Sequence, residues 1–222
     1  MVHVTENLEN VVQKIRAAKN KYLLKDKTTE TQLIAVSKTF SASQIRPLLV
    51  HGHRHFGENK LQEAQQKWVA LKQEYPDIYL HMIGSLQSNK AKDAILLFDR
   101  IHALDRESLA KKLANLQETG HKIPPCLVQV NIGKESQKSG VLLQEFSDFI
   151  VFCKDLKLPI DGLMCLPPIG ENAAPFFLML KEMAQQYNLP HLSMGMSQDF
   201  ELATAMGASF VRVGSSIFGN RV

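Results

Sequence analysis

The chain has little that would mark a secreted, membrane-bound or metal-stabilised protein. Its three cysteines, Cys126, Cys153 and Cys165, lie among apolar neighbours at no spacing typical of a metal site. No apolar run approaches the roughly 20 residues of a membrane-spanning helix, and the first residues lack the basic-then-apolar order of a signal peptide. We therefore expect a cytoplasmic protein without a membrane partner or a metal site, in which the cysteines are buried free thiols.

Charge of one sign is also scarce. The net charge is +4 at pH 7, which is too weak to indicate a nucleic-acid partner, although a few local cations are enough to bind a small anion. Hydrophobic residues make up 45 % of the 222 residues, as in ordinary globular proteins. Because the chain has no low-complexity stretch and no linker, we predict a single domain over residues 1–222.

Apolar strands and helical segments alternate along the chain. Leu8, Val11, Val12 and Ile15 recur at helical spacing and predict an N-terminal helix. Eight strand–helix units follow it, with strands predicted near residues 33–38, 54–56, 79–83, 100–104, 126–131, 160–164, 191–193 and 209–213. Helices are expected to include Leu142 after the fifth strand and to run from Ser197 to Met206 after the seventh.

Continuous apolar strands with helical crossovers are typical of a parallel sheet buried on both faces. Eight such units predict an α/β fold, a closed (β/α)8 TIM barrel with one extra N-terminal helix. An open doubly wound sheet is the alternative, but no G-x-G-x-x-G motif follows the first strand.

A lysine, Lys38, ends the first apolar strand. Alternation places Ile34, Val36 and Lys38 on one face, so the amine projects into the mouth of the barrel if that face is the interior. Active residues of such barrels lie at the carboxyl ends of the strands, and lysine amines attack carbonyl groups. The alternative is a solvated lysine where a strand becomes a loop.

A second cation, Arg212, lies inside the last strand. A buried guanidinium needs an acceptor, which is either a carboxylate from a neighbouring strand or a group of a ligand. The turn from Ser193 to Ser197 and the segment Gly214-Ser215-Ser216 place small residues and hydroxyls after strands seven and eight. This pair matches the usual phosphate site of these barrels, although Ser197 is also suited to be a helix N-cap.

The ordered motifs of the chain resemble the YggS/PROSC family of pyridoxal phosphate (PLP) homeostasis proteins. The resemblance rests on Ala35–Lys38, Phe56–Asn59, His81–Lys90, Val130–Ile132, Lys138–Gly140, Gly162–Met164, Ser193–Ser197, Val211–Gly214 and Ile217–Gly219. It implies the barrel of fold-type III PLP proteins, the class of the alanine racemase N-terminal domain.

The resemblance also implies the roles of single residues. Lys38 is expected to carry PLP as a Schiff base. Ser197, Gly214 and Ser215 are expected to hold the phosphate, Arg212 to face the pyridine nitrogen, Asn59 to line the side of the ring and Met194 to form a wall of the pocket.

By the same resemblance the protein stores PLP within intracellular vitamin B6 homeostasis, delivers it to apo PLP-dependent enzymes, acts as a monomer and has no turnover of its own. An amino-acid racemase is the alternative. Racemases of this fold take a tyrosine from a second domain, and we expect that domain to be absent because the chain reaches Val222 directly after the eighth unit. A Schiff-base aldolase acting on a phosphosugar is a third hypothesis.

Three further sets of residues are candidates for a role. An extended backbone would place the side chains of His51, His53 and His55 on one face, an arrangement that a zinc site could use. We favour the alternative, in which they are surface or loop-packing histidines. Lys138 is either a second aldehyde-reactive amine or a solvated loop lysine. Glu58 and Asn131 are candidates for polar contacts at the mouth of the barrel.

Overall fold

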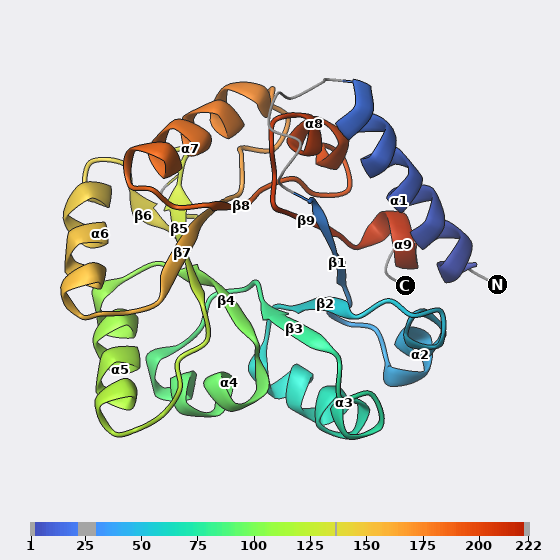
Figure 1. Cartoon of the computed structure of the whole chain (residues 1–222), viewed down its shortest axis with the longest axis horizontal. Helices are drawn as coiled ribbons and strands as arrows, with labels where there is room; N and C mark the ends of the chain where they lie inside the picture. Colours follow the sequence, from blue (N-terminus) through green and yellow to red (C-terminus); the bar gives the residue numbers. More distant parts are fainter. Residues whose placement is uncertain (1–2, 22–29, 136, 220–222) are drawn as a thin grey trace.

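The computed structural model describes residues 3–21, 30–135 and 137–219, and in this part of the chain the strands form one parallel barrel (Figure 1). Neighbours pair in the order β1, β2, β3, β4, β5, β7, β8, β9, and β9 pairs with β1 to close the ring, while the short β6 pairs with the end of β5. The strands are β1 (Gln32–Val36), β2 (His55–Glu58), β3 (Tyr79–Met82), β4 (Arg100–Leu104), β5 (Cys126–Asn131), β6 (Val141–Leu142), β7 (Ile160–Cys165), β8 (His191–Ser193) and β9 (Phe210–Val213).

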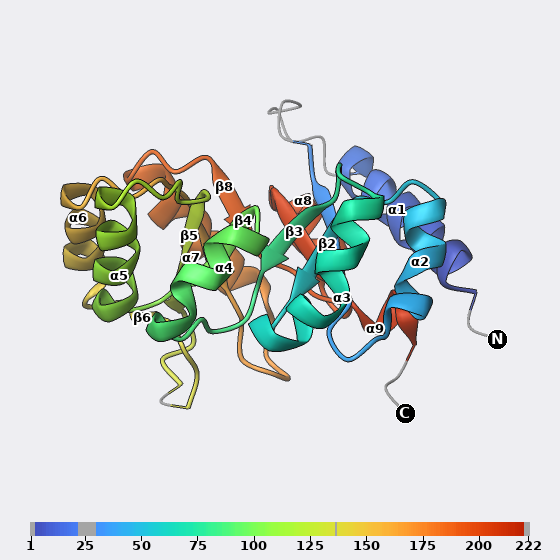
Figure 2. The ribbon, with the colours of Figure 1, turned by 90° about the horizontal axis from the view of Figure 1, so that it is seen from below.

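Helices surround the barrel on its outer side (Figures 1 and 2). Each barrel strand is followed by at least one of them, which gives the parallel strands their crossovers. They are α1 (Val4–Lys21), α2 (Ala42–Val50), α3 (Leu61–Glu74), η1 (Ser88–Lys90), α4 (Ala91–Leu97), α5 (Glu107–Glu118), α6 (Phe146–Asp155), α7 (Ala174–Gln186), α8 (Phe200–Ala205) and α9 (Ser215–Phe218).

The strands separate two apolar cores. The larger core lies between the strands and the helices and contains the fully buried Trp68 and Phe177. The smaller core lies inside the barrel and consists of Ile34, Ala103, Leu127, Met164 and Phe210. Ile34 faces inward while Leu33 and Ala35 belong to the outer core, so the predicted division of the first strand is confirmed.

Register shifts occur between β5 and β7 and, with consequences for the barrel interior, in β4. Two residue pairs fix its register against β5, Ile101 with Cys126 and Leu104 with Val128. All four side chains belong to the outer core. The two on β5 are two residues apart, as alternation requires, but the two on β4 are three residues apart. The extra residue makes a β-bulge. Both residues between Ile101 and Leu104, His102 and Ala103, are therefore left on the interior side.

The helix that precedes the barrel, α1, packs against α8 and α9 beside the closure of the ring (Figure 1). Leu8, Val11 and Ile15 are buried in the outer core, as the helical spacing predicted. The Asn7 side-chain amide donates a hydrogen bond to the Ile217 carbonyl oxygen at 2.9 Å. The extra helix thus covers the segment that carries the last turns of the barrel. Across residues 3–21, 30–135 and 137–219, no helix combines the length and the apolar character that crossing a membrane requires.

The predicted barrel is confirmed, and its errors lie at element boundaries. Leu142 belongs to β6 rather than to a helix, since α6 begins at Phe146. The helix after β8 begins at Phe200 rather than at Ser197. The three cysteines are free and buried, as predicted, and burial raises the pKa of Cys153 and Cys165 to about 12.

Candidate functional site

Lys38 lies two residues beyond β1, in a half-buried turn at the carboxyl end of the barrel. The Ser37 N–H donates to the Gly57 carbonyl at 3.0 Å, and the Phe40 N–H donates to the Ser37 carbonyl at 3.1 Å. Thr39 has a φ of 70°, which is uncommon for residues other than glycine. Contacts within the protein therefore fix the backbone that carries the lysine.

A buried carboxylate supports this turn from the outer side of the barrel. Glu58 Oε1 accepts hydrogen bonds from Ser37 Oγ at 2.6 Å, Trp68 Nε1 at 2.9 Å and Lys67 Nζ at 2.9 Å. Lys67 Nζ also donates to the Ser37 carbonyl at 2.8 Å. Burial raises the pKa of Glu58 against the opposing charge of Lys67. The four residues, called the Glu58 cluster below, tie the Lys38 turn to α3.

Two polar candidates for the mouth have other roles. Glu58 does not face the mouth, so that prediction is wrong. It shares the outward face of β2 with Phe56 and is fully buried in front of α3. Asn131 instead holds the loop that follows β5, where its side chain donates to the Glu135 carbonyl at 2.8 Å and accepts from the Glu135 N–H at 3.1 Å.

Arg212 lies on the neighbouring strand, with Ile34 as its partner in the β1–β9 register. The side chain is only 4 % exposed. Its Nη1 donates to Ser193 Oγ, and its Nη2 donates to the Cys165 carbonyl at 2.9 Å. In the described part of the chain its acceptors are thus a hydroxyl and a carbonyl rather than a carboxylate. Each terminal nitrogen carries two N–H groups, so both nitrogens can also donate to a ligand.

The turns after β8 and β9 meet at the same end of the barrel. The Gly214 N–H donates to Ser197 Oγ at 3.3 Å, Ser215 begins α9, and Met194 is fully buried directly after β8. Ser197 is not a helix N-cap, because α8 begins at Phe200 and Asp199 occupies the N-cap position. The two predicted anion-binding turns therefore form one surface.

The backbone leaves no room for side chains at two glycines of this surface. A Cβ atom at Gly214 would lie 3.3 Å from the Val36 carbonyl oxygen, which is a tight contact. Gly195 has a φ of +92°, and a Cβ atom there would lie 2.4 Å from the Ala203 Cβ. The glycines let the turn after β9 approach the end of β1 and the turn after β8 pack closely on α8.

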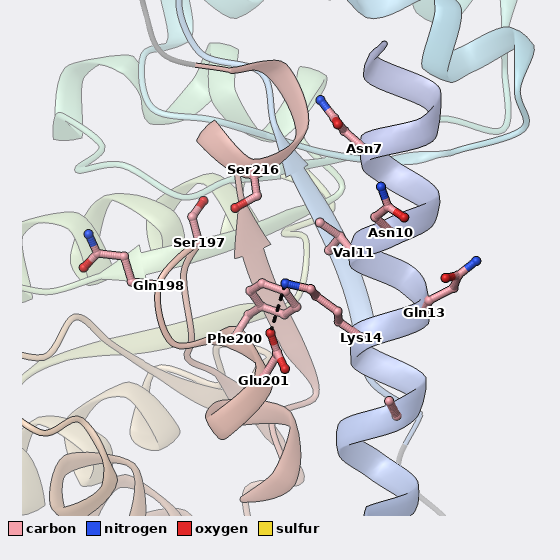
Figure 3. Close-up of a pocket in the computed structure, with 11 residues that line it drawn as sticks. Asn7, Asn10, Val11, Gln13, Lys14, Ser197, Gln198, Phe200, Glu201 and Ser216 are labelled. Carbon is pink, nitrogen blue, oxygen red and sulfur yellow. Dashed lines mark ion pairs between the residues drawn. The ribbon is translucent and has the colours of Figure 1, made fainter. Parts of the chain in front are cut away.

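A groove of about 510 Å³ opens beside this surface, between α1 and the segment of α8 and α9 (Figure 3). Ser197 and Ser216 line one wall, and Asn10 and Lys14 of α1 line the other. The Lys14 amine forms an ion pair with Glu201 at 3.5 Å across the groove. The Ser197 hydroxyl can therefore be reached from outside the barrel.

Asn59 directly follows β2 and is half-buried. Val36 lies opposite Gly57 in the β1–β2 register, so Asn59 and Lys38 follow neighbouring strands at the same level. A Cβ atom at Gly84 would lie 2.4 Å from the Asn59 carbonyl oxygen, which shows that the loop after β3 packs directly on Asn59. The predicted site residues thus come together at one end of the barrel.

Sequence analysis missed a chain of polar side chains inside the barrel. His55 Nδ1 lies 3.1 Å from His81 Nε2, and His81 Nδ1 lies 2.9 Å from His102 Nε2. His102 Nδ1 lies 2.8 Å from Ser193 Oγ, which accepts from Arg212. The signal available in the sequence was a histidine in the middle of two apolar strands. For His102 it was ambiguous, because the bulge in β4 decides which way the side chain faces.

Burial holds these histidines neutral. It lowers the pKa of His81 and His102 well below the ordinary value. Arg212 and Arg100 lower the pKa of His102 further, and the neighbouring histidines and Arg100 lower that of His81. His55 is less buried, and burial lowers its pKa as well, with Asp99 opposing the effect.

The remaining candidates lie apart from this end of the barrel or are engaged elsewhere. His51 is exposed and lies 3.2 Å from Glu9. His53 Nε2 lies 2.7 Å from the His55 carbonyl oxygen, and burial lowers the pKa of His53 to about 4. Lys138 Nζ pairs with Glu135 at 2.5 Å and donates to the Pro167 carbonyl at 3.1 Å. In the part of the chain described, no three metal-ligating side chains converge.

Comparison with known families gives a match over nearly the whole chain. The sequence profile of the family described as "Alanine racemase, N-terminal domain" matches residues 7–222. A Pyridoxal phosphate homeostasis protein of Pseudomonas aeruginosa is 38 % identical over 232 residues, which cover 100 % of this chain and 97 % of the relative.

Solved structures agree with this assignment. PipY of Synechococcus elongatus without PLP superimposes with a TM-score of 0.81 at 35 % identity, covering 98 % of this chain and 100 % of PipY. PipY with PLP bound gives a TM-score of 0.75 at 37 % identity, covering 91 % of this chain and 99 % of PipY. An alanine racemase of Clostridium difficile gives 0.67 at 13 % identity, covering 94 % of this chain and 56 % of the racemase, which shows a shared fold.

The neutral histidines predict a loss of stability in mild acid. Histidines of the unfolded chain take up protons below about pH 6.5, while His81 and His102 resist protonation in the folded protein. The unfolded state then binds more protons, so the free energy of unfolding falls as pH decreases from 7 to 5, by up to about 1.4 kcal/mol per pH unit for each histidine.

Urea denaturation at pH 7, 6 and 5, followed by the fluorescence of the single tryptophan, measures this dependence. His81→Gln should reduce the slope, whereas His121→Gln in the turn after α5 should retain it. A free energy of unfolding that is constant or increases between pH 7 and pH 5 would contradict the prediction.

Proposed function

The chain belongs to the family of the alanine racemase N-terminal domain and, within it, to the pyridoxal phosphate homeostasis proteins, and we propose that it holds PLP as a Schiff base on Lys38 and serves as an intracellular store and donor of the cofactor. The observation that carries the proposal is the convergence of an amine, a buried guanidinium and a pair of anion-binding turns at the ends of the adjacent strands β8, β9 and β1.

The residues present fit this cofactor. When bound, PLP would supply an aldehyde that condenses with amines, a phosphate, and a pyridine ring that acts as an electron sink. The Lys38 amine would hold the aldehyde carbon through a C=N bond, with the aldehyde oxygen and the two amine hydrogens leaving as one water. Ser197, Gly214 and Ser215 supply a hydroxyl and the N–H groups of a helix start, which suit a phosphate. Asn59 lies beside Lys38 at the end of the next strand.

Arg212 suits the pyridine nitrogen. A buried guanidinium beside this nitrogen disfavours its protonation, because two positive charges would meet. An unprotonated ring withdraws electrons weakly, which suits storage or racemisation better than transamination. Met194, fully buried after β8, supplies an apolar wall.

The absence of turnover is part of the proposal. Racemisation needs an acid or base on each face of the cofactor, and Lys38 can serve one face. His81 is not available for the other face, because it is fully buried and its two ring nitrogens contact His55 and His102. These contacts support a carrier rather than a racemase. A phosphosugar aldolase has no support from the relatives reported above.

We place the protein in the cytoplasm as a monomer whose partners are PLP and apo PLP-dependent enzymes, without nucleic acid or membrane. The three free buried cysteines support a reducing compartment, and the net charge of +4 is small for a nucleic-acid partner.

Borohydride reduction of the PLP-loaded protein, followed by peptide mass mapping, should place the phosphopyridoxyl group on Lys38. Lys38→Ala should lose the visible absorbance band and keep its circular dichroism, because the half-buried side chain contributes little packing. Lys138→Ala is the matched control, a lysine of another loop, and should keep the band. Labelling mainly at Lys138 would overturn the assignment.

The phosphate site predicts a separate effect on affinity. Loss of one hydrogen bond to a charged group costs about 1.5–3 kcal/mol, so Ser197→Ala should raise the Kd for PLP by about 10- to 100-fold. Gly214→Asp should weaken binding further than the isosteric Gly214→Asn, since only aspartate adds a negative charge beside the phosphate, and the asparagine variant shows the effect of crowding against Val36. Equal Kd values for Gly214→Asp and the wild type would exclude this phosphate site.

Carrier and enzyme can be separated in one preparation. Chiral chromatography of alanine and other common amino acids should detect no multiple-turnover racemisation, and the PLP-loaded protein should reactivate an apo PLP enzyme. Racemisation with a kcat in the ordinary range of about 1–1000 per second, abolished in Lys38→Ala, would establish the racemase instead.

A further inference from the structure

The hydrogen-bonded side chains inside the barrel, called the histidine chain below, connect β9 to β2 across its centre. The order is Arg212, Ser193, His102, His81 and His55. The step between His102 on β4 and Ser193 on β8 joins strands that do not neighbour each other in the sheet. Ser193, His102 and His81 are fully buried, while His55 is half-buried at the start of β2.

The guanidinium decides the direction of every hydrogen bond in the chain. Arginine only donates, so Ser193 Oγ accepts from Arg212 and its own proton is available for His102 Nδ1, 2.8 Å away. His102 Nδ1 then carries no proton, and His102 Nε2–H donates to His81 Nδ1 at 2.9 Å. By the same logic His81 Nε2–H donates to His55 Nδ1 at 3.1 Å.

The opposite direction leaves a donor unused. If His102 Nδ1–H donated to Ser193 Oγ, that oxygen would accept twice and the hydroxyl proton would need a third partner. In the described residues the side-chain partners of Ser193 Oγ are Arg212 and His102. A buried donor without an acceptor is destabilising, so the chain that begins at Arg212 is favoured.

The direction holds only while the three rings are neutral, because an imidazolium donates through both nitrogens and accepts through neither. Arginines lie close to the chain. Arg212 and Arg100 disfavour a charge on His102, and Arg100 disfavours one on His81. At the half-buried His55, burial and Arg100 act against the opposing Asp99 carboxylate. The Asp161 carboxylate is bound by Arg100 Nη1 at 2.8 and 2.6 Å. Charge and hydrogen bonding therefore favour the same neutral state.

We propose that His102, His81 and His55 are positioning residues for the cofactor site: their one-directional chain of hydrogen bonds holds the Ser193 hydroxyl as an acceptor for Arg212 and so keeps the guanidinium directed at the pyridine nitrogen. The role toward this nitrogen rests on the proposed function, whereas the hydrogen-bond chain is a property of the protein alone. Apolar side chains could fill the same space but would leave the Ser193 hydroxyl proton without His102 Nδ1, the acceptor that fixes its orientation.

The chain itself can be tested without cofactor. Long-range ¹H–¹⁵N NMR spectra of the full ¹⁵N-labelled protein without PLP at pH 7 distinguish the two neutral tautomers and the imidazolium. His81 and His102 should both be neutral with the proton on Nε2, assigned through the spectra of His81→Gln and His102→Asn. A proton on Nδ1 of His102, or a charged ring at either position, would refute the proposal whether or not the protein binds PLP.

The effect on the site is tested with two substitutions of His102. Phenylalanine keeps a ring but offers no acceptor, whereas the asparagine side-chain oxygen lies close to the position of Nδ1 and can accept from Ser193. His102→Phe should raise the Kd for PLP about tenfold and move the ¹⁵N shift of PLP labelled at the ring nitrogen. In His102→Asn, both the Kd for PLP and the ring-nitrogen shift should stay close to the wild-type values. The control His121→Gln should change neither the Kd nor the shift.

A folded His102→Phe protein with wild-type Kd and ring-nitrogen shift, or equal damage in His102→Asn, overturns the positioning role. If His102→Phe does not fold, Ser193→Ala, which removes only one oxygen, replaces it in the test. A wild-type Kd for PLP and a wild-type ring-nitrogen shift in Ser193→Ala then overturn the positioning role. If the wild-type protein binds no PLP, the proposed function fails, while the tautomers measured without PLP still decide whether the chain exists.

Discussion

The pairing of β1 with β9 is the contact on which the site depends. It joins residues about as far apart in sequence as the chain allows, with Ile34 opposite Arg212 and Ala35 opposite Val213. Without this pairing, Lys38 and Gly214 would follow the two opposite edge strands of an open sheet. The glycine allows the closure, because a side chain at Gly214 would press against Val36. The helix α1 packs over the same region and ties to α9 through Asn7.

Two polar networks lie on opposite sides of the barrel wall that carries Lys38. On the outer side the Glu58 cluster fixes the turn through a buried carboxylate with three donors. On the inner side the barrel offers Arg212 and the histidine chain. Buried polar groups stabilise a fold only when they find partners. Glu58 Oε1 and both ring nitrogens of His81 and His102 have partners, whereas the buried Glu58 Oε2 has none within the described residues. A barrel interior filled by apolar residues alone would be simpler to fold and could not hold a guanidinium in place.

Much of the architecture followed from local pattern. Buried parallel strands are apolar on both faces, so they stand out from the amphipathic helices between them, and all eight barrel strands lie where they were predicted. Boundaries were less certain, because they depend on capping and on loop contacts. Ser197 was a plausible N-cap by residue type, but Asp199 takes that position. Leu142 suited a helix, yet it pairs with Asn131 at the end of β5.

The sequence by itself determined which residue types end the strands, and therefore that a lysine, an arginine and two anion-binding turns would gather at one end of a barrel. Only the tertiary structure decided what they contact. Alternation predicts a side chain's face as long as strands stay in register, but the bulge in β4 turns both His102 and Ala103 inward. The partner of His102 is Ser193, 91 residues away on a strand across the barrel. Contacts of this kind depend on barrel closure and on a single extra residue in one strand, and no local pattern encodes either.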